Sequence, residues 1–143
     1  MLLIDIQNDF IDGTLAVARA AEIVPALNDL RLHGGFDLVA LSLDWHPPHH
    51  CSFARNARLH VEHPHGHAHN MQAAEFTRVR LRSGASQELW PEHCVAGSRG
   101  AQLHKDLITM PDDVYVMKGT HWMVDSYSAF FDCDHISQTT LAR

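Results

Sequence analysis

Short, mostly apolar runs that stop abruptly at polar residues dominate the pattern along this chain. Runs of this length and composition are typical of strands buried on both faces, as in a parallel sheet. We therefore predict three buried strands. They cover residues 2–6 (LLIDI, before Gln7-Asn8-Asp9), 36–43 (FDLVALSL, before Asp44-Trp45-His46-Pro47) and 114–117 (VYVM, before Lys118-Gly119).

A helical period lies between the first two runs. From Ala20 to His33 the apolar residues recur at intervals of three and four, as on one face of a helix. Pro25 falls in the first turn, where proline is tolerated, and Gly34-Gly35 supply a stop. Strand, helix and strand form a βαβ unit, which predicts an α/β fold with a mainly parallel sheet.

The rest of the chain gives weaker signals. Residues 47–100 show no sustained period and are rich in His, Pro, Gly, Asn and Arg, so we expect an irregular segment there. Connections this long are usually functional or disordered. A helix is expected to begin near Ser137, and no repeat or linker divides residues 1–143, which we take as one domain or most of one.

Composition narrows the function classes. The formal net charge is −6, and the positive residues are scattered, which argues against nucleic acid or an anionic membrane as partner. No apolar run reaches the roughly 18 residues of a membrane span, and the N-terminus lacks the features of a signal peptide, so we expect a cytoplasmic protein. Three widely spaced cysteines without a Cys-x-x-Cys pair favour reduced thiols.

Three charged residues close the predicted strands: Asp5, Asp44 and Lys118. Because parallel strands end at one edge of a sheet, and open α/β folds bind ligands at that edge, we expect these groups to lie near each other. Lys118 fits two interpretations equally, a solvated lysine at a strand end or a charge paired with Asp5 that orients an acid–base group.

A metal site is a further hypothesis. Asp44 and His46 flank Trp45, and the pleat of a strand could aim both at one ion, although a surface turn with a capping Asp has the same pattern. His93 or Cys94 would offer a third ligand. Three protein ligands with open positions are typical of a catalytic metal.

Taken together, six blocks of this sequence resemble the nicotinamidases, which are amidases of the isochorismatase-like hydrolase superfamily. The blocks occur in the family's order and run almost from end to end of the chain. They are residues 3–10 (LIDIQNDF), 14–17 (TLAV), 44–47 (DWHP), 89–95 (LWPEHCV), 118–120 (KGT) and 125–128 (DSYS).

The resemblance implies a role for each matched position. Asp5 corresponds to the acid–base residue that takes the proton of the nucleophilic thiol and passes it to departing ammonia, and Lys118 completes the triad. Asp44, His46 and His93 correspond to the ligands of a divalent metal ion, zinc in most members and manganese or iron in others. An open position of that metal receives the pyridine nitrogen of nicotinamide.

The resemblance also implies a substrate pocket. Phe10 and Trp90 correspond to aromatic residues that hold the flat ring, a contact suited to aromatic faces and edges. Tyr127 is expected near the same pocket. Ser52 corresponds to a serine that can touch the water shell of the metal.

One part of the family pattern has no match. The family's nucleophile lies in a stretch like Gly-Leu-Ala-Thr-Asp-Tyr-Cys after the fourth strand, and no such stretch occurs here. Cys51, Cys94 and Cys133 are not expected to replace it, because Cys133 lies between two carboxylates that should raise its pKa. We therefore expect residues 1–143 to be the N-terminal, incomplete portion of the domain and to be inactive by themselves.

The fold implied by the resemblance is a three-layer α/β/α domain whose complete sheet has the order 3-2-1-4-5-6. Without strands 4 to 6, strand 1 would be an exposed apolar edge, which predicts poor solubility or pairing with another chain and leaves a homo-oligomer open. The histidine-rich segment His60–His69 lies outside the matched blocks. We interpret it as a solvated insertion, with a second metal site as the alternative.

The implied function is the hydrolysis of nicotinamide to nicotinic acid and ammonia through a thioester, as a step in NAD salvage. A hydrolase acting on another carboxamide or on isochorismate is one rival, but those relatives generally lack the Asp44, His46 and His93 set. A truncated, non-catalytic protein that binds metal or nicotinamide is the other rival.

Overall fold

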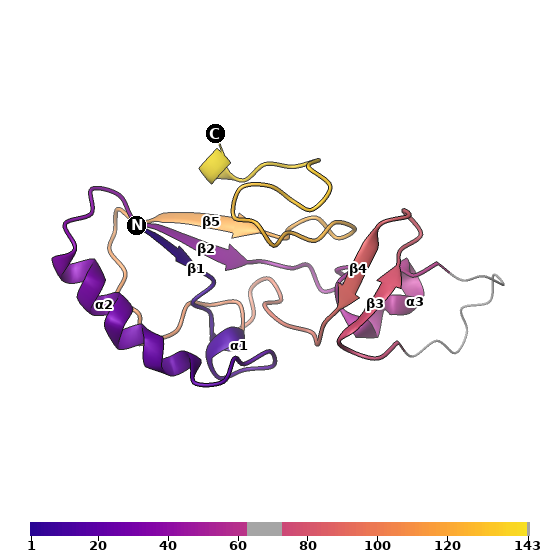
Figure 1. The fold of residues 1–143 in the computed structure, drawn as a ribbon, viewed down its shortest axis with the longest axis horizontal. Coiled ribbons are helices and arrows are strands. Elements are labelled where there is room, and N and C mark those ends of the chain that lie inside the picture. Colours follow the sequence, from indigo (N-terminus) through magenta and orange to yellow (C-terminus); the bar gives the residue numbers. More distant parts are fainter. Residues whose placement is uncertain (63–72, 143) are drawn as a thin grey trace.

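A three-stranded parallel sheet forms the centre of the protein. The computed structural model describes residues 1–62 and 73–142. The strands β1 (Leu2–Ile4), β2 (Ala40–Asp44) and β5 (Val114–Lys118) pair in the order β1-β2-β5. Counting only these three strands along the chain gives the predicted order 3-2-1, and Figure 1 shows all three running in one direction.

The strands differ from the prediction at their ends. β1 ends at Ile4 because Asp5 adopts a left-handed backbone conformation, with φ at 55°, which turns the chain out of the sheet. β2 begins at Ala40 and not at Phe36. Its neighbour β1 begins opposite Ala40, at Leu2, so the residues before Ala40 have no strand beside them on that side.

The predicted helix is present but begins differently. Its first turn is the 3-10 helix η1 (Ala20–Glu22), and the α-helix α2 covers Ile23–His33. Val24 and Leu27 of α2 pack against Leu3, Leu41 and Leu43 of the sheet, and this cluster is the larger hydrophobic core. The helix therefore covers one face of the sheet. The short helix α1 (Asn8–Ile11) follows β1.

The expectation of an irregular segment over 47–100 was wrong in part. The segment contains the 3-10 helix η2 (Ala54–Asn56), the helix α3 (Ala57–His60) and an antiparallel pair of strands, β3 (Thr77–Arg80) and β4 (Ser86–Leu89). Cys51, Ala54, Ala57, Val61, Leu81 and Leu89 form a second, smaller core there. Figure 1 places this unit beyond the carboxyl ends of the parallel strands.

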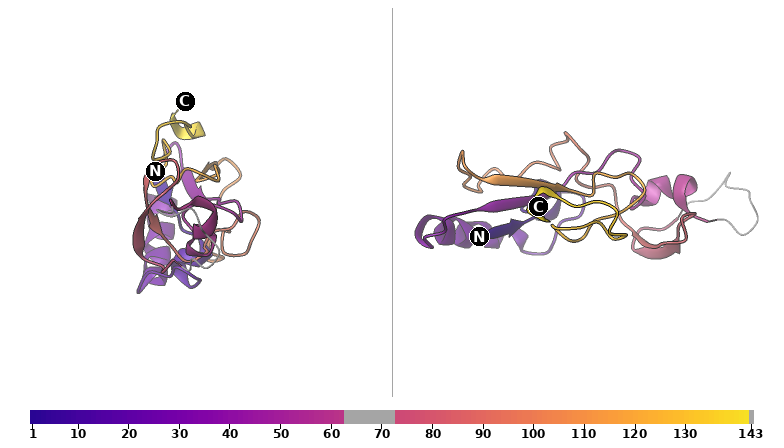
Figure 2. Two further views of the ribbon diagram at one scale, coloured as in Figure 1. Left: turned by 90° about the vertical axis from the view of Figure 1, so that its right-hand side faces the viewer. Right: turned by 90° about the horizontal axis from the view of Figure 1, so that it is seen from above.

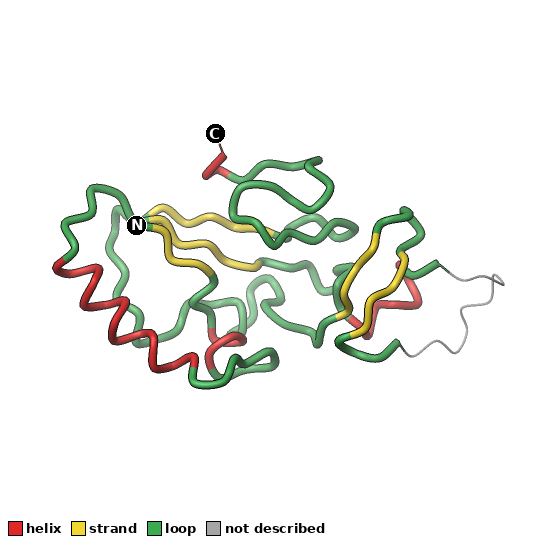
Figure 3. The backbone as a smooth tube through the Cα atoms, in the orientation of Figure 1, coloured by secondary structure: helices red, strands yellow, loops and turns green. Residues whose placement is uncertain are grey.

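The expected helix near Ser137 was also wrong. The described C-terminal residues form turns and one short 3-10 helix, η3 (Thr140–Ala142), as Figure 3 shows. The carboxylate of Asp132 accepts hydrogen bonds from the amides of Ile136 (2.8 Å) and Ser137 (2.7 Å), which favours a turn over a helix. Figures 1 and 2 show this segment beside β5.

The free edge of β1 is apolar, as predicted. Ile4 is 56% exposed, and it borders an apolar groove of about 370 Å³ that Phe10, Val17 and Ile23 also line.

Within the described ranges, none of the helices is both long enough and apolar enough to cross a membrane.

Candidate active site and metal centre

The three charged residues at the strand ends meet as predicted. The ammonium group of Lys118 lies 3.0 Å from Oδ2 of Asp5 and also donates to Asp44 and to the carbonyl oxygen of Ser126 (3.1 Å). Lys118 is only 4% exposed. Of its two interpretations, the structure therefore supports the paired charge and not the solvated lysine.

Burial and the neighbouring charges act in opposite directions on the pKa values of these groups. Burial lowers the pKa of Lys118, but Asp44 and Asp5 outweigh burial and raise it overall, so the lysine stays protonated. Burial dominates at Asp5 and raises its pKa, although Lys118 and Ser42 act in the opposite direction. A carboxyl group with a raised pKa is better suited to accept and return a proton than an ordinary one.

Ser42 contacts the candidate acid–base residue, and the sequence analysis missed it. Its buried hydroxyl donates a 2.6 Å hydrogen bond to Oδ1 of Asp5, and its carbonyl oxygen accepts the amide of Asp5 at 3.1 Å. Lys118 contacts the other carboxylate oxygen of Asp5. Both oxygens are thus oriented, one by a residue of β2 and the other by a residue of β5.

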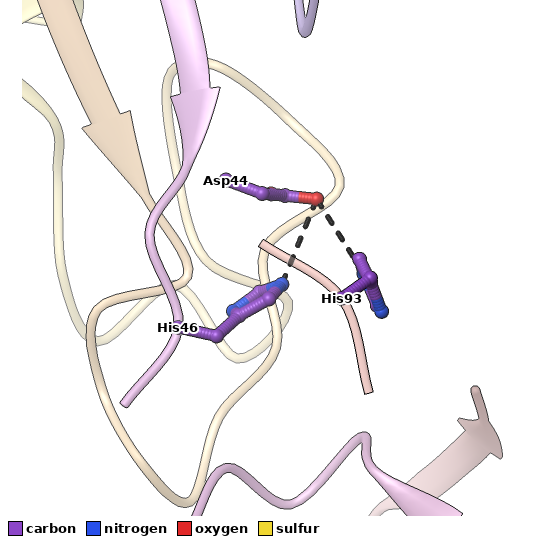
Figure 4. Close-up of side chains that lie close together, drawn as sticks. All are labelled: Asp44, His46 and His93. Carbon is purple, nitrogen blue, oxygen red and sulfur yellow. Dashed lines mark ion pairs between the residues drawn. The ribbon is translucent and has the colours of Figure 1, made fainter. Parts of the chain in front are cut away.

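The three predicted metal ligands also converge (Figure 4). Nε2 of His46 lies 3.6 Å from Oδ2 of Asp44, and Nε2 of His93 lies 3.8 Å from the same oxygen. All three residues are buried. Ligand atoms at about 2.0–2.1 Å from a tetrahedral zinc are about 3.4 Å apart, so the spacing is close to that of a zinc site.

The hydrogen bonds of the two imidazoles test whether a cation fits. Nδ1 of His46 lies 2.9 Å from the carbonyl oxygen of Gly119, and Nδ1 of His93 lies 2.8 Å from that of Pro91. A carbonyl only accepts, so Nδ1 must carry the proton, and Nε2 of a neutral ring then presents a lone pair. Two lone pairs and the Asp44 carboxylate face one point, which suits a metal ion.

The ionisation of the ligands agrees with this donor set. Burial raises the pKa of Asp44, but His46 and Lys118 outweigh burial and lower the pKa to about 2. Burial lowers the pKa of His46, whereas the Asp44 carboxylate raises it more, so a positive charge at Nε2, either a proton or a metal ion, is favoured. Burial lowers the pKa of His93, which keeps that ring neutral and able to ligate.

A pocket of about 220 Å³ joins Asp5 and Lys118 to the three potential metal ligands. Phe10, Trp90 and Tyr127, the predicted ring contacts, line it beside Asp5, Lys118 and the three ligand residues. The indole N–H of Trp90 donates to the hydroxyl of Tyr127 at 3.2 Å. The structure therefore brings eight of the nine residues that the sequence analysis placed at the site to one cavity.

Asp125 also lines this pocket, and the sequence analysis gave it no role of its own. Its carboxylate accepts the amide of Ser126 and the side chain of Gln87, each at 2.8 Å. Gln87 comes from β4, so the hairpin holds the loop that carries Asp125 and Tyr127. The only sequence signal was the position of Asp125 in the last matched block.

Ser52 does not reach the pocket. Its hydroxyl lies 2.8 Å from Nδ1 of His50, and both side chains are fully buried. The ring of His50 stacks on that of His46, with 4.1 Å between their centroids. His46, His50 and Asp125 form a second convergent group of potential ligand atoms.

None of the three cysteines lines the pocket. Cys51 and Cys94 are buried, and burial raises the pKa of Cys51 to about 12 and raises that of Cys94 as well. Cys133 is exposed as a residue, but partial burial of its thiol, together with nearby carboxylates such as Asp125, raises its pKa. These thiols are poor nucleophiles at neutral pH.

The histidine-rich segment is only partly described. His60 is buried, and its Nε2 lies 2.8 Å from the carbonyl oxygen of His49, so this residue has a structural contact. The remaining histidines, between residues 63 and 69, lie outside the described residues.

Comparison with known proteins agrees with the geometry. No protein-family model matches the chain. The nicotinamidase of Acinetobacter baylyi is 37% identical over 143 residues, which are 99% of this chain and 59% of that protein. The nicotinamidase of Saccharomyces cerevisiae is 31% identical over 154 residues, with 100% of this chain and 67% of that protein covered.

A solved structure agrees as well. The yeast nicotinamidase Pnc1p bound to the inhibitor nicotinaldehyde superimposes with a TM-score of 0.81 at 26% identity, over 99% of this chain and 66% of that chain. The chain thus spans about three fifths to two thirds of the length of these relatives. On sequence and on structure, it belongs to the nicotinamidase family and has the isochorismatase-like α/β fold.

Proposed function

We propose that the protein hydrolyses nicotinamide to nicotinic acid and ammonia, and that residues 1–143 supply its acid–base pair, its metal ligands and its ring pocket. The observation that carries this proposal is that Asp5, Lys118 and the three potential metal ligands line one cavity with three aromatic side chains. This combination provides proton transfer, a cation and a flat apolar surface in one place.

Asp5 is the proton carrier in this proposal. Its carboxylate would accept the proton of the attacking thiol and then give it to the nitrogen that leaves as ammonia. Lys118 and Ser42 hold the two carboxylate oxygens, so Asp5 keeps one orientation through both transfers. Lys118 also connects Asp5 to Asp44, which links the acid–base pair to the metal centre.

Asp44, His46 and His93 would hold the divalent ion. One carboxylate and two imidazoles suit zinc, and manganese or iron would also accept them. When bound, such an ion supplies a positive charge and open coordination positions for the ring nitrogen of the substrate. The carbonyls of Gly119 and Pro91 fix the orientation of the two imidazoles.

The pocket suits a neutral aromatic amide. With a divalent ion, the three carboxylates and the one ammonium group that line it sum to no net charge. A neutral amide would therefore leave the pocket without net charge, whereas an anionic carboxylate product would add an uncompensated negative charge. The faces of Phe10 and Trp90 provide apolar contact for a flat ring, and the solved yeast relative was bound to nicotinaldehyde, a ring of that size.

The nucleophile is proposed to lie outside these 143 residues. No cysteine lines the pocket, and all three have raised pKa values. The thiol of the whole protein would attack the carboxamide carbon, the C–N bond would break, and water would release nicotinic acid from the thioester. Backbone amides beside that thiol would hold the oxyanion.

The test is ammonia release from nicotinamide by the protein of the complete reading frame. We expect turnover that falls by several orders of magnitude in Asp5→Asn, since the members of such a unit act together. Residues 1–143 alone should release no ammonia. If the complete protein bound nicotinamide without turnover, it would be a binding protein, and turnover by residues 1–143 would place the nucleophile among Cys51, Cys94 and Cys133.

A further inference from the structure

Three consecutive polar side chains after β1 are buried, although none of them lines the pocket. Gln7 is 0%, Asn8 6% and Asp9 8% exposed. Buried polar groups need partners, and each of these side chains has them on the backbone of distant segments. Their partners lie at Asp44 and in the loop 93–102, which are the segments that carry two of the three metal ligands.

Gln7 takes the place of a strand beside Asp44. The chain leaves the sheet at Asp5, so β1 has no residue left to pair with the end of β2. The carboxamide of Gln7 fills this position: its Oε1 accepts the amide of Asp44 and its Nε2 donates to the carbonyl of Asp44, both at 2.8 Å. The same Nε2 donates to the carbonyl of Ala101 at 2.8 Å.

Asp9 forms a hydrogen bond to the backbone of the segment that carries His93. Its Oδ2 accepts the amide of Cys94, the residue after His93, at 2.7 Å. Cys94 has a left-handed backbone, with φ at 47°, which a side-chain-bearing residue adopts only when its surroundings hold it there. A methyl group at Gly100 would meet Oδ2 of Asp9 at 1.9 Å, so the carboxylate lies directly against this loop.

Asn8 differs from its two neighbours in one respect. Its Nδ2 donates to the carbonyl of Arg99 at 2.8 Å, on the same loop but several residues from His93. It is as buried as Asp9 and has one such hydrogen bond. Replacing Asn8 therefore shows whether the loss of any buried hydrogen bond to this loop weakens metal binding, or only the loss of one beside a metal ligand.

We propose that Gln7 and Asp9 are positioning residues of the metal centre, which hold Asp44 and His93 at the separation that a divalent ion needs. Gln7 fixes Asp44 from the side that β1 leaves open, and Asp9 fixes the turn that follows His93. This inference rests on the proposed metal site. Partners of ligand residues that do not themselves bind the metal typically change its affinity 10- to 100-fold.

The experiment measures metal binding by the protein of the complete reading frame, without any need for turnover. Cobalt(II) is titrated into metal-free protein, and its visible absorption reports the affinity and the coordination geometry. We expect Gln7→Met and Asp9→Ala to raise the dissociation constant about 10- to 100-fold and to change the spectrum at saturation. Asp9→Asn, which keeps an acceptor for the amide of Cys94, should restore part of the affinity.

Asn8→Ala is the matched control, with near-wild-type affinity and an unchanged spectrum. Equal losses in Asn8→Ala, or unchanged binding in folded Gln7→Met and Asp9→Ala, would overturn the inference. If Gln7→Met does not fold by circular dichroism, Gln7→Glu, which keeps the acceptor for the Asp44 amide, takes its place. Wild-type protein that binds no cobalt, zinc or manganese would refute the metal site itself, which is a different result.

Discussion

Replacing Lys118 by methionine removes the positive charge that lies between the buried carboxylate of Asp44 and the partly buried carboxylate of Asp5. Lys118 contacts both Asp5 and Asp44, and its side chain is 3% exposed. Removing one partner of a buried ion pair costs about 3–5 kcal/mol, because the remaining charge has no compensation. We therefore expect the free energy of unfolding of metal-free Lys118→Met to fall by about that amount at pH 7.

The chain offers a matched control, because Lys105 is its only other lysine. Its side chain is 78% exposed and pairs with the adjacent Asp106, so Lys105→Met should leave the stability unchanged within error. Urea unfolding in EDTA, followed by tryptophan fluorescence, measures both variants. Equal losses in the two variants would refute the ion-pair argument.

The difference in the free energy of unfolding between wild type and Lys118→Met should also depend on pH. Burial raises the pKa of Asp44, but His46 and Lys118 lower it from 3.8 to about 2, so its favourable interactions stabilise the fold above pH 3.8. That contribution is lost as the pH falls from 3.8 towards 2. The difference in the free energy of unfolding between wild type and Lys118→Met should therefore have its full size at pH 7 and become smaller below pH 3.8. A gap that widens in acid would contradict the assignment.

Three further predictions concern other parts of the molecule. Gly119→Ala should weaken zinc binding in calorimetry at least tenfold, because φ at this glycine is +64° and a Cβ would lie 2.3 Å from the ring of His46. Asp113→Ala should lower the free energy of unfolding, measured by thermal unfolding, by about 3–5 kcal/mol, because it leaves the buried Arg31 unpaired. The double variant Arg31→Met and Asp113→Leu, which leaves no buried charge, should lose much less stability. Replacing the four histidines between 63 and 69 by serine should leave the zinc content after dialysis unchanged, and a fall in zinc content would refute their interpretation as a solvated insertion.

The sheet and its charged edge could be predicted because they depend on local pattern. Apolar runs that end at Asp5, Asp44 and Lys118 determine where the chain is buried and where it leaves the sheet. The hairpin β3–β4 could not be predicted in this way. Its strands, TRVR and SQEL, are mostly polar, and their buried contacts lie in a small local core that no periodicity reveals.

The supporting residues of the site could not be predicted for a different reason. Ser42, Gln7 and Gln87 act through hydrogen bonds to residues 37 or more positions away along the chain. Such partners become neighbours only in the folded protein, so no spacing in the sequence indicates them. The matched blocks included Gln7 without giving the reason for its presence, and the structure supplies that reason.

Anomalous diffraction from crystals of the zinc-loaded protein tests the proposed metal centre most directly. We expect one strong zinc peak within about 2.0–2.2 Å of a carboxylate oxygen of Asp44 and of Nε2 of both His46 and His93. The peak should disappear in His93→Ala crystals grown under the same conditions. A peak bound by other residues, or zinc-loaded crystals in which these three side chains point apart, would contradict the account.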